Sequence, residues 1–574
     1  MFSVMEGVVR SAEPEAAPAF PDRFDRPGAA DRSTRRFSVA SIALLLVLFV
    51  VTALGFYLRL WIIGHAPINS DEAVVGLMAK GILHGHFSAF FWGQSYGGVE
   101  PYAVAAVFSV AGQSAFALTL APALLSLIAV VVVWRLGRRL FGRAPALVAA
   151  ILAWIWCESS LWNATREYGF HEVELVLGLL VLLQVVRIRD AALGDRGDRG
   201  DRGDRVVDWF VVGALVGLGW WAAPEIAYFA VPGAVFLVIS LWRRPIAAVG
   251  ARVGVAVGGF FVFASPWFVA SFSDHFATLR ASGGTPLPGN GYPDRLSTFF
   301  SHVLPMILGL RVEGAGVWEV SQKFGVAVYV ALLVALVASL VLIAYRVPAA
   351  RPLAAVAVAY PLLYAAFPSA WFWNDGRYAI SLTPVVALVL VGGLWTAVSG
   401  AVVRWASIVV LVAATASTLV AFNDGFGAVT SLSKLTTWGT HPNSVAVSLG
   451  DALHAHRVRD VYAGYWVAYD LQFTSGDGIS VMSVDPDRDV AESQAVQQAP
   501  RAGWVFVGVA PTDQAVAEAQ FGSAAGLDAD SIIESALVGW LTAHGVSYTT
   551  FRSGPMEVVL PARNVTPAQV NAQA

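Results

Sequence analysis

Long apolar runs, spaced along most of the sequence, constrain this chain more than any other feature. A helix needs about 20 apolar residues to cross a bilayer, and about eleven runs approach that length. They lie near 39–64, 114–134, 144–161, 169–187, 206–223, 225–242, 247–271, 325–345, 353–368, 379–398 and 405–422. Only 13% of the residues are charged, whereas about 25% is usual in soluble proteins. The sequence therefore predicts a polytopic α-helical membrane protein.

Arginines fall in every second loop between these runs. The members of this set are Arg35, Arg36, Arg135, Arg138, Arg139, Arg143, Arg187, Arg189, Arg243, Arg244, Arg346, Arg351 and Arg404. Short loops rich in Arg and Lys stay in the cytoplasm. We therefore expect a multi-pass protein of the cell inner (plasma) membrane. Its extracytoplasmic side receives loop 65–113, the 162–168 turn, loop 272–324, the 369–378 turn and the C-terminal region.

The two ends of the chain differ in composition from the apolar part. Residues 1–38 are rich in Ala, Pro, Asp and Arg without apolar periodicity, which predicts a disordered cytoplasmic tail. Residues 39–424 form the expected transmembrane domain. From 425 to 574, apolar runs of strand length alternate with helix-like segments, which predicts a small exported α/β domain. The charge-balanced repeat at 195–205 is typical of a solvated spacer.

Two further composition facts exclude classes of function. The net charge of −3 argues against a generally basic nucleic-acid binder, so we expect no nucleic acid among the partners. The chain has one cysteine, Cys157, which excludes an internal disulfide and a Cys-rich metal site. Four histidines, His65, His84, His86 and His171, lie near the exported face, but their spacing is not that of a zinc site. We therefore predict no metal site and no cofactor, although a divalent metal remains possible.

The first exported loop, 65–113, carries more chemistry than a connection between two spans needs. Ionisable groups at a membrane boundary suggest a functional site. Asp71 and Glu72 follow Asn69 at a predicted helix start, and Glu100 opens a second helical stretch. Helix capping and a favourable helix dipole explain the first two equally well. Two acidic helix starts on one loop nevertheless favour a converging polar site, whose other members in this loop are Lys80, Trp92, Gln94 and Tyr96.

Two later exported turns add charged residues. Arg166 and Glu167 lie in the first of these, and Glu172 and Glu174 follow in the next apolar run. Some of these acids have a purely structural alternative, which is pairing with Arg166.

The second turn, WNDGRY at 373–378, contains Asp375, Arg377 and Tyr378. A cation at a helix start opposes the dipole, so Arg377 is better explained as a ligand for an anion such as phosphate. Pairing with Asp375 is the structural alternative.

Five segments together resemble a known superfamily. They are SDEAVVGLMA (70–79), FWGQSYGG (91–98), VEPY (99–102), TREYG (165–169) and NDGRYAISLTP (374–384). The chain is similar over roughly 39–422 to the GT-C glycosyltransferases, in particular to bacterial protein O-mannosyltransferases and aminoarabinose transferases. The resemblance implies a GT-C fold and an inverting transfer, without a nucleotide, from a polyprenyl-phosphate-linked sugar to an envelope acceptor at the bilayer.

The same resemblance implies roles for individual residues. Asp71 matches the catalytic base, and Glu72 and Glu100 match carboxylates of the catalytic site. The donor phosphate region is matched by Arg377 and Tyr378, with Arg166 or Lys80 as further cations. We expect the substrate pocket to contain Trp92, Gln94, Tyr96, Glu167, His171 and Asp375. One departure is that Arg166 is followed by glutamates where the family usually has an aspartate.

Two other functions compete with the enzyme. A transporter or flippase of lipid-linked sugars would place its polar groups near the bilayer midplane, often in paired broken helices. Here the charges gather at the exported ends of the runs, and no internal repeat is visible. A non-catalytic envelope scaffold would leave Asp71, Glu100 and Arg377 without a role. The enzyme therefore explains the sequence best, although neither the sugar nor the acceptor is specified.

Overall fold

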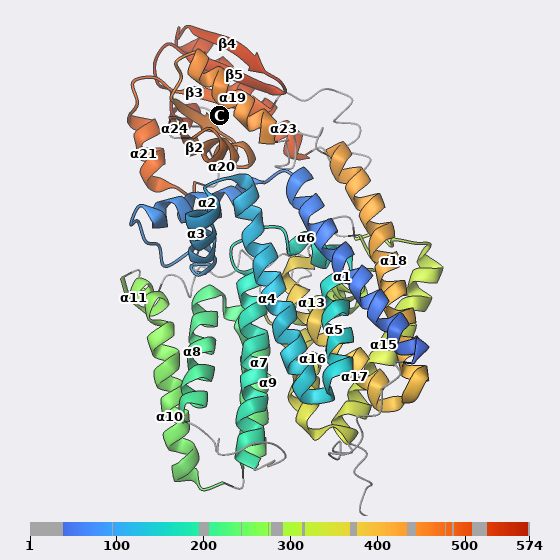
Figure 1. Cartoon of the computed structure of the whole chain (residues 1–574). Coiled ribbons are helices and arrows are strands. Elements are labelled where there is room, and N and C mark those ends of the chain that lie inside the picture. Colours follow the sequence, from blue (N-terminus) through green and yellow to red (C-terminus); the bar gives the residue numbers. More distant parts are fainter. Residues whose placement is uncertain are drawn as a thin grey trace, which may run out of the picture.

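The computed structural model describes residues 38–571, except for 95, 194–205, 243, 274, 277–290, 313–315, 368–375, 433–442, 477, 485–486 and 508–524. The predicted tail (up to residue 37), the charged repeat and Asp375 lie outside the described residues. Every predicted apolar run coincides with a helix or a pair of helices (Figure 1). These are α1 (Val39–His65), α4 (Ala115–Phe141), α5 (Arg143–Ile155), α7 (His171–Leu193), α8 (Val206–Ala222), α9 (Ala227–Leu241), α10 (Ile246–Phe263), α11 (Ser265–Ser273), α15 (Gln322–Arg346), α16 (Arg351–Tyr364), α17 (Thr383–Ala397) and α18 (Gly400–Leu432).

These helices differ in whether they can cross a bilayer unaided. Six helices in the described part of the chain are long and apolar enough, or seven if α10 and α11, bent by 58° at their junction, form one span. Two of the six include a preceding 3-10 turn, η1 (Pro224–Ile226) before α9 and η5 (Gly376–Leu382) before α17. The helices that do not meet this criterion are short, such as α5 with 13 residues, or begin with acidic residues, as α7 does. Helix length and composition by themselves therefore identify six or seven of the predicted spans in the described part of the chain.

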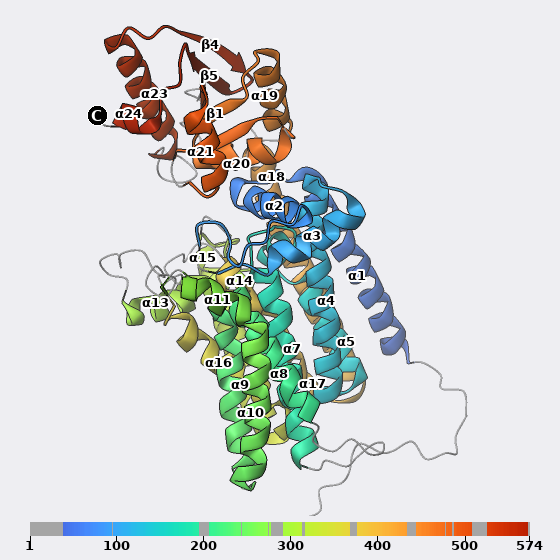
Figure 2. The same cartoon turned by 90° about the vertical axis from the view of Figure 1, so that its left-hand side faces the viewer.

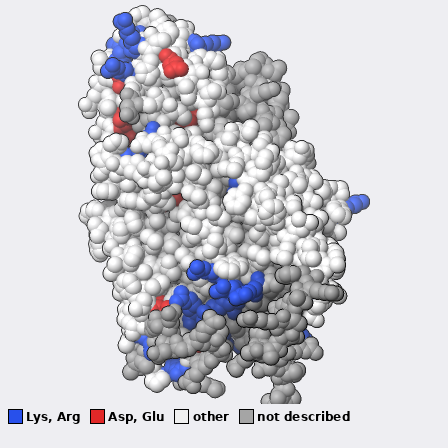
Figure 3. Space-filling view, viewed as in Figure 1, with Lys and Arg blue, Asp and Glu red and all other residues white. Residues whose placement is uncertain are grey.

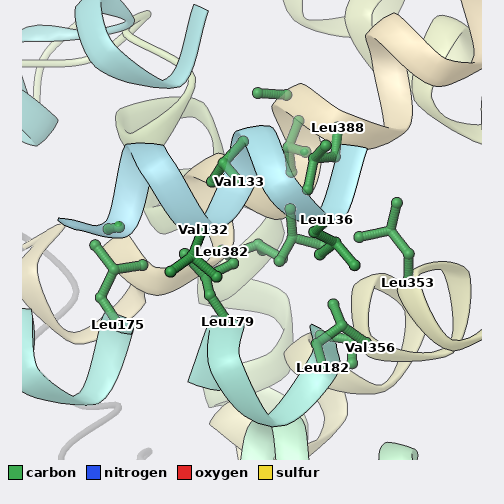
Figure 4. Close-up of a cluster of buried hydrophobic side chains, with 14 of the residues drawn as sticks. Val132, Val133, Leu136, Leu175, Leu179, Leu182, Leu353, Val356, Leu382 and Leu388 are labelled. Carbon is green, nitrogen blue, oxygen red and sulfur yellow. The ribbon is translucent and has the colours of Figure 1, made fainter. Parts of the chain in front are cut away.

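The helical bundle has an apolar centre and an apolar outside. The η5–α17 span is 78% buried, whereas only 6% of the apolar window of α15 is buried. Figure 4 shows side chains from α4, α7, α16, η5 and α17 meeting at the centre, including Val133, Leu179, Val356 and Leu388. Exposed apolar residues on α1 and α15, such as Phe49 and Phe324, are what helices facing lipid require.

The C-terminal domain contains a five-stranded sheet in the order β2-β1-β3-β5-β4. Strand β1 (Asp460–Ala463) is parallel to β2 (Ser480–Ser483) and β3 (Gly503–Val507). Strand β5 (Met556–Pro561) is antiparallel to both β3 and β4 (Tyr548–Ser553). The helices of the domain are α19 (Asn443–Ala455), α20 (Tyr465–Thr474), α21 (Val490–Gln498), α23 (Ala525–Ala543) and α24 (Pro567–Asn571). This confirms the predicted small α/β domain.

The first loop and the C-terminal domain share one hydrophobic core. The loop forms α2 (Ser70–Leu83) and α3 (Glu100–Ala111), which lie beside the domain at one end of the bundle (Figures 1 and 2). Met78 and Phe108 of the loop pack in the same cluster as Phe473 and Met556 of the domain. A Cβ on Gly76 would come within 2.5 Å of the Phe473 ring, so this helix face depends on a glycine for its close approach.

Short helices complete the described part of the bundle. They are α6 (Glu158–Asn163), α13 (Tyr292–Thr298), the π-helix η2 (Phe299–Val303), α14 (Leu304–Ile307) and η3 (Pro348–Ala350). Figure 3 shows a dense group of Lys and Arg side chains near the end of the bundle opposite the C-terminal domain. Arg138 and Arg139 in the last turn of α4, and Arg346 in the last turn of α15, belong to the predicted cytoplasmic set.

Candidate active site

Two adjacent acids at the start of α2, Asp71 and Glu72, make different contacts. Asn69 caps the helix, because its side chain accepts a hydrogen bond from the Glu72 N–H at 3.1 Å. Glu72 Oε2 accepts in return from the Asn69 N–H at 2.9 Å, which completes a capping box. Glu72 is fully buried, whereas the Asp71 side chain is 25% exposed. Glu72 is therefore part of the helix cap, whereas the more exposed Asp71 is not.

Asp71 lies where three elements meet. Its Oδ2 is 3.8 Å from Nη1 of Arg377, which follows Gly376 at the start of η5. Its Oδ1 accepts a hydrogen bond from the hydroxyl of Tyr465, the first residue of α20. Burial, followed by the charge of Asp71, raises the pKa of Tyr465, so its hydroxyl stays protonated and acts as the donor. The structure thus joins a carboxylate and a cation that are 306 residues apart (377 − 71) in the sequence.

Aromatic rings surround the cation of this pair. The Arg377 guanidinium lies 4.6 Å from the ring centre of Tyr168 and 5.2 Å from that of Tyr378. His171, which is buried, packs against Tyr378 with the ring centres 5.1 Å apart. Cation–π contacts of this kind hold a guanidinium in place without neutralising its charge. The Arg377 side chain is 18% exposed, so its charge is close to the surface of the site.

Arg166 occupies a different place from the one predicted for a phosphate ligand. Its Nη1 is 3.4 Å from Glu72 Oε1, and both side chains are buried. Its Nη2 donates to the Pro67 carbonyl at 2.6 Å, and its guanidinium lies 4.1 Å from the Trp162 ring centre. Burial raises the pKa of Glu72, and Arg166 opposes that rise. This buried pair connects the 164–170 turn to the start of α2.

Glu100 and Glu167 form a second buried arrangement. Their carboxyl groups interact directly, and neither side chain is exposed by more than 1%. Burial raises the pKa of Glu100 to about 7. Burial and the neighbouring Glu100 raise the pKa of Glu167 well above its usual value. Two carboxyl groups in contact hold a proton between them, because both cannot ionise cheaply in a dry environment. Glu172 and Glu174 are also buried, in the first turn of α7.

The aromatic loop that contains Trp92 and Gln94 is hydrogen-bonded to the C-terminal domain. Arg488 Nη1 donates to the Trp92 carbonyl at 3.1 Å. The Gln94 side-chain oxygen, in the amide orientation that satisfies both groups, lies 2.6 Å from Arg488 Nη1 and 3.1 Å from Nη2. Tyr96 packs edge-on against Phe170, with the ring centres 5.1 Å apart. The predicted residues of this loop are thus gathered, but partly by a residue of another domain.

Lys80 is also placed differently from its predicted role. Its Nζ donates to the Phe473 carbonyl at 3.0 Å and lies 4.4 Å from the Phe473 ring centre. These contacts connect α2 to α20, and the hydrogen bond uses one of the N–H donors of the Lys80 ammonium group.

Tyr465 and Arg488 are site residues that the sequence did not reveal. Tyr465 lies two residues after the end of β1, and Arg488 lies five residues after the end of β2. Sites in α/β sheets gather outside the carboxyl ends of parallel strands. That position is the signal that would have identified both residues, but it requires the strand order. Among the described residues, no group of three or more His, Cys, Asp or Glu side chains is arranged to hold a metal ion.

Comparison with known proteins gives a partial match to one family and a similar fold. Residues 98–269 match the family model described as dolichyl-phosphate-mannose-protein mannosyltransferase. A search of curated protein sequences finds no match.

Two solved structures of ArnT from Cupriavidus metallidurans are similar along almost the whole chain. The apo state has a TM-score of 0.57 at 13% identity, covering 91% of this chain and 98% of ArnT. The state bound to undecaprenyl phosphate has a TM-score of 0.56 at 13% identity, covering 90% and 97%. The chain therefore shares the fold of ArnT, and its bundle contains six or seven helices that are long and apolar enough to cross a membrane among the described residues.

Proposed function

We propose that this protein transfers a monosaccharide from a polyprenyl-phosphate donor to a cell-envelope acceptor, with inversion and with Asp71 as the general base. The single observation that carries the proposal is the juxtaposition of the Asp71 carboxylate and the Arg377 guanidinium at the end of the bundle. The family model, whose description names a dolichyl-phosphate-linked sugar, and the ArnT structure with undecaprenyl phosphate support a lipid-phosphate donor.

The chemistry needs one base and one anion-binding group. An acceptor hydroxyl attacks the anomeric carbon as the bond from that carbon to the phosphate oxygen breaks. Asp71 takes the hydroxyl proton, and the lipid phosphate leaves with the bonding electron pair. Phosphate is a good leaving group without protonation, so the second carboxylic acid of a glycosidase is not required. A single displacement from the opposite face inverts the anomeric configuration.

The charged residues have different roles in this scheme because they occupy different positions. Arg377 offers parallel N–H donors to the phosphate oxygens and stabilises the charge that develops there. Glu72 is already committed to the helix cap and to Arg166, so Asp71 is the better base of the adjacent pair. The Glu100–Glu167 pair acts as a buried support behind the site in this scheme. The alternation of arginines in the sequence supports a reaction on the extracytoplasmic side.

The test is turnover by purified Asp71→Asn protein in nanodiscs, with polyprenyl-phosphate mannose, arabinose and aminoarabinose offered in turn. An amide cannot accept the proton, and general bases contribute about 10²–10⁴-fold, so turnover should fall at least about hundredfold. Asp208→Asn is the matched control, because Asp208 forms a surface pair with Arg187 in the first turn of α8. Parental turnover by Asp71→Asn would remove Asp71 as the base. Lipids of a deletion strain would identify the sugar through the donor that accumulates.

A further inference from the structure

We infer that the C-terminal domain is part of the catalytic unit and that its Tyr465 is a positioning residue for Asp71, an inference that rests on the proposed role of Asp71 as the base. The hydroxyl of Tyr465 donates to Asp71 Oδ1, across 394 positions of sequence. Tyr465 is only 8% exposed, so water does not compete freely for this hydrogen bond. The domain thus reaches the reacting group directly, in addition to covering it.

The topology of the sheet explains why this residue arrives there. Strands β1 and β2 are parallel, so both carboxyl ends lie at one edge of the sheet. Tyr465 follows β1 and Arg488 follows β2 at that edge. Such edges are the usual ligand-binding side of α/β sheets. In this protein the edge is turned toward α2, where both residues contact the first loop.

The hydrogen bond has a definite consequence for the base. A carboxylate on a two-bond side chain rotates unless something holds it, and one bound oxygen fixes the direction of the other. With Oδ1 held by Tyr465, Oδ2 remains on the side of Arg377, at 3.8 Å. The hydrogen bond also stabilises the ionised form of the carboxylate, which is the form that accepts a proton.

A second set of contacts keeps the tyrosine in place. The Arg488 N–H donates to the hydroxyl of Tyr469, whose ring packs edge-on against Tyr465 with the ring centres 5.5 Å apart. The Arg488 guanidinium lies 5.6 Å from the Tyr465 ring centre while it contacts Trp92 and Gln94. The position of Tyr465 is therefore fixed from the domain side and from the loop side together.

The test compares Tyr465→Phe with Tyr462→Phe in the full-length protein in nanodiscs. Tyr462 is a matched control, because its hydroxyl donates to Asn564 Oδ1 at 3.0 Å within the domain. Tyr465→Phe should lower kcat about tenfold with little change in the KM for the donor. Loss of a hydrogen bond to the ionised carboxylate should also move the acid limb of the kcat/KM profile to higher pH. Tyr462→Phe should leave that limb where it is.

A second variant separates positioning from folding. Fluorotyrosine placed at 465 keeps the ring and the hydroxyl but donates a stronger hydrogen bond, so the acid limb should move to lower pH, opposite to the effect of Phe. Parental turnover and pH profile in Tyr465→Phe, beside an inactive Asp71→Asn, would overturn this inference alone. Parental turnover in Asp71→Asn would overturn the proposed base and this inference with it. A lower melting temperature with an unmoved acid limb in both Tyr465 variants would also overturn it.

Discussion

Replacing Arg166 with methionine should destabilise the fold more than it impairs donor binding. Methionine keeps apolar volume beside Trp162 and removes only the charge and the hydrogen bonds. Glu72, which is fully buried, then loses the cation 3.4 Å from its carboxylate and keeps the N–H groups of Asn69 and Glu167. The substitution therefore measures the effect of the buried ion pair while the packing around it is kept.

The size of the effect follows from burial. The side chains of Arg166 and Glu72 are 1% and 0% exposed, and removing one partner of such a pair costs about 3–5 kcal/mol. The two remaining N–H donors favour the lower end, about 3 kcal/mol. Without Arg166, the pKa of buried Glu72 in the folded protein rises further above its unfolded value. The loss should then grow as pH rises from 6 to 8, because stability tied to a raised carboxyl pKa disappears at higher pH.

Thermal melts of the purified protein at pH 6 and pH 8 measure this effect. Arg187→Met is the control, since Arg187 pairs with Asp208 while 51% exposed and such pairs contribute at most about 1 kcal/mol. The double variant Glu72→Gln with Arg166→Met leaves no buried charge and should recover part of the loss. If Arg166→Met melts like the parent at pH 8 but no longer binds donor lipid, Arg166 contacts the donor and the structural assignment is refuted.

Three further outcomes are expected. Arg377→Ala should lose most of the donor affinity and Arg377→Lys part of it, on the order of 2–4 kcal/mol for Ala, in nanodisc binding assays; unchanged binding by Arg377→Ala would reduce Arg377 to a partner of Asp71. Burial raises the pKa of Glu100 from 4.5 to about 7, so its contribution to stability is present below pH 4.5 and lost as pH rises through 7. Glu100→Gln should flatten that decline in melts, and parallel curves would contradict this. Reporters inserted at Gly142 and fused after Asn571 should report opposite sides of the membrane; the same side for both would reject the topology.

The helical bundle could be predicted because its signal is local. A run of apolar residues specifies a helix wherever it lies, and each predicted run coincides with helical structure. The length of each helix was harder to predict, because breaks such as the one between α10 and α11 depend on packing as well as on hydropathy. The α/β character of the C-terminal domain was also readable from run length, but the order of its strands was not.

The candidate site was predictable only in part, for a related reason. Asp71 lies at the start of α2, shortly after the first span, and Arg377 lies at the start of the η5–α17 span, where charges are conspicuous in the sequence. The choice between Asp71 and Glu72 depends on which side chain faces the interior, and that is decided by the Asn69 cap together with Arg166. Tyr465 has no charge and no motif. Only the strand arrangement brings it to the base.

The core shared by the first loop and the C-terminal domain has a consequence for biosynthesis. Val74 and Met78 of α2 lie in one cluster with Leu471 and Phe473, which leave the ribosome nearly 400 residues later at 5–20 residues per second. For tens of seconds, these α2 residues therefore lack their contacts with the C-terminal domain. A chain truncated before β1 would lack Leu471 and Phe473 and could not complete this cluster. The order of synthesis thus makes docking of the C-terminal domain the step that completes the core of the first loop.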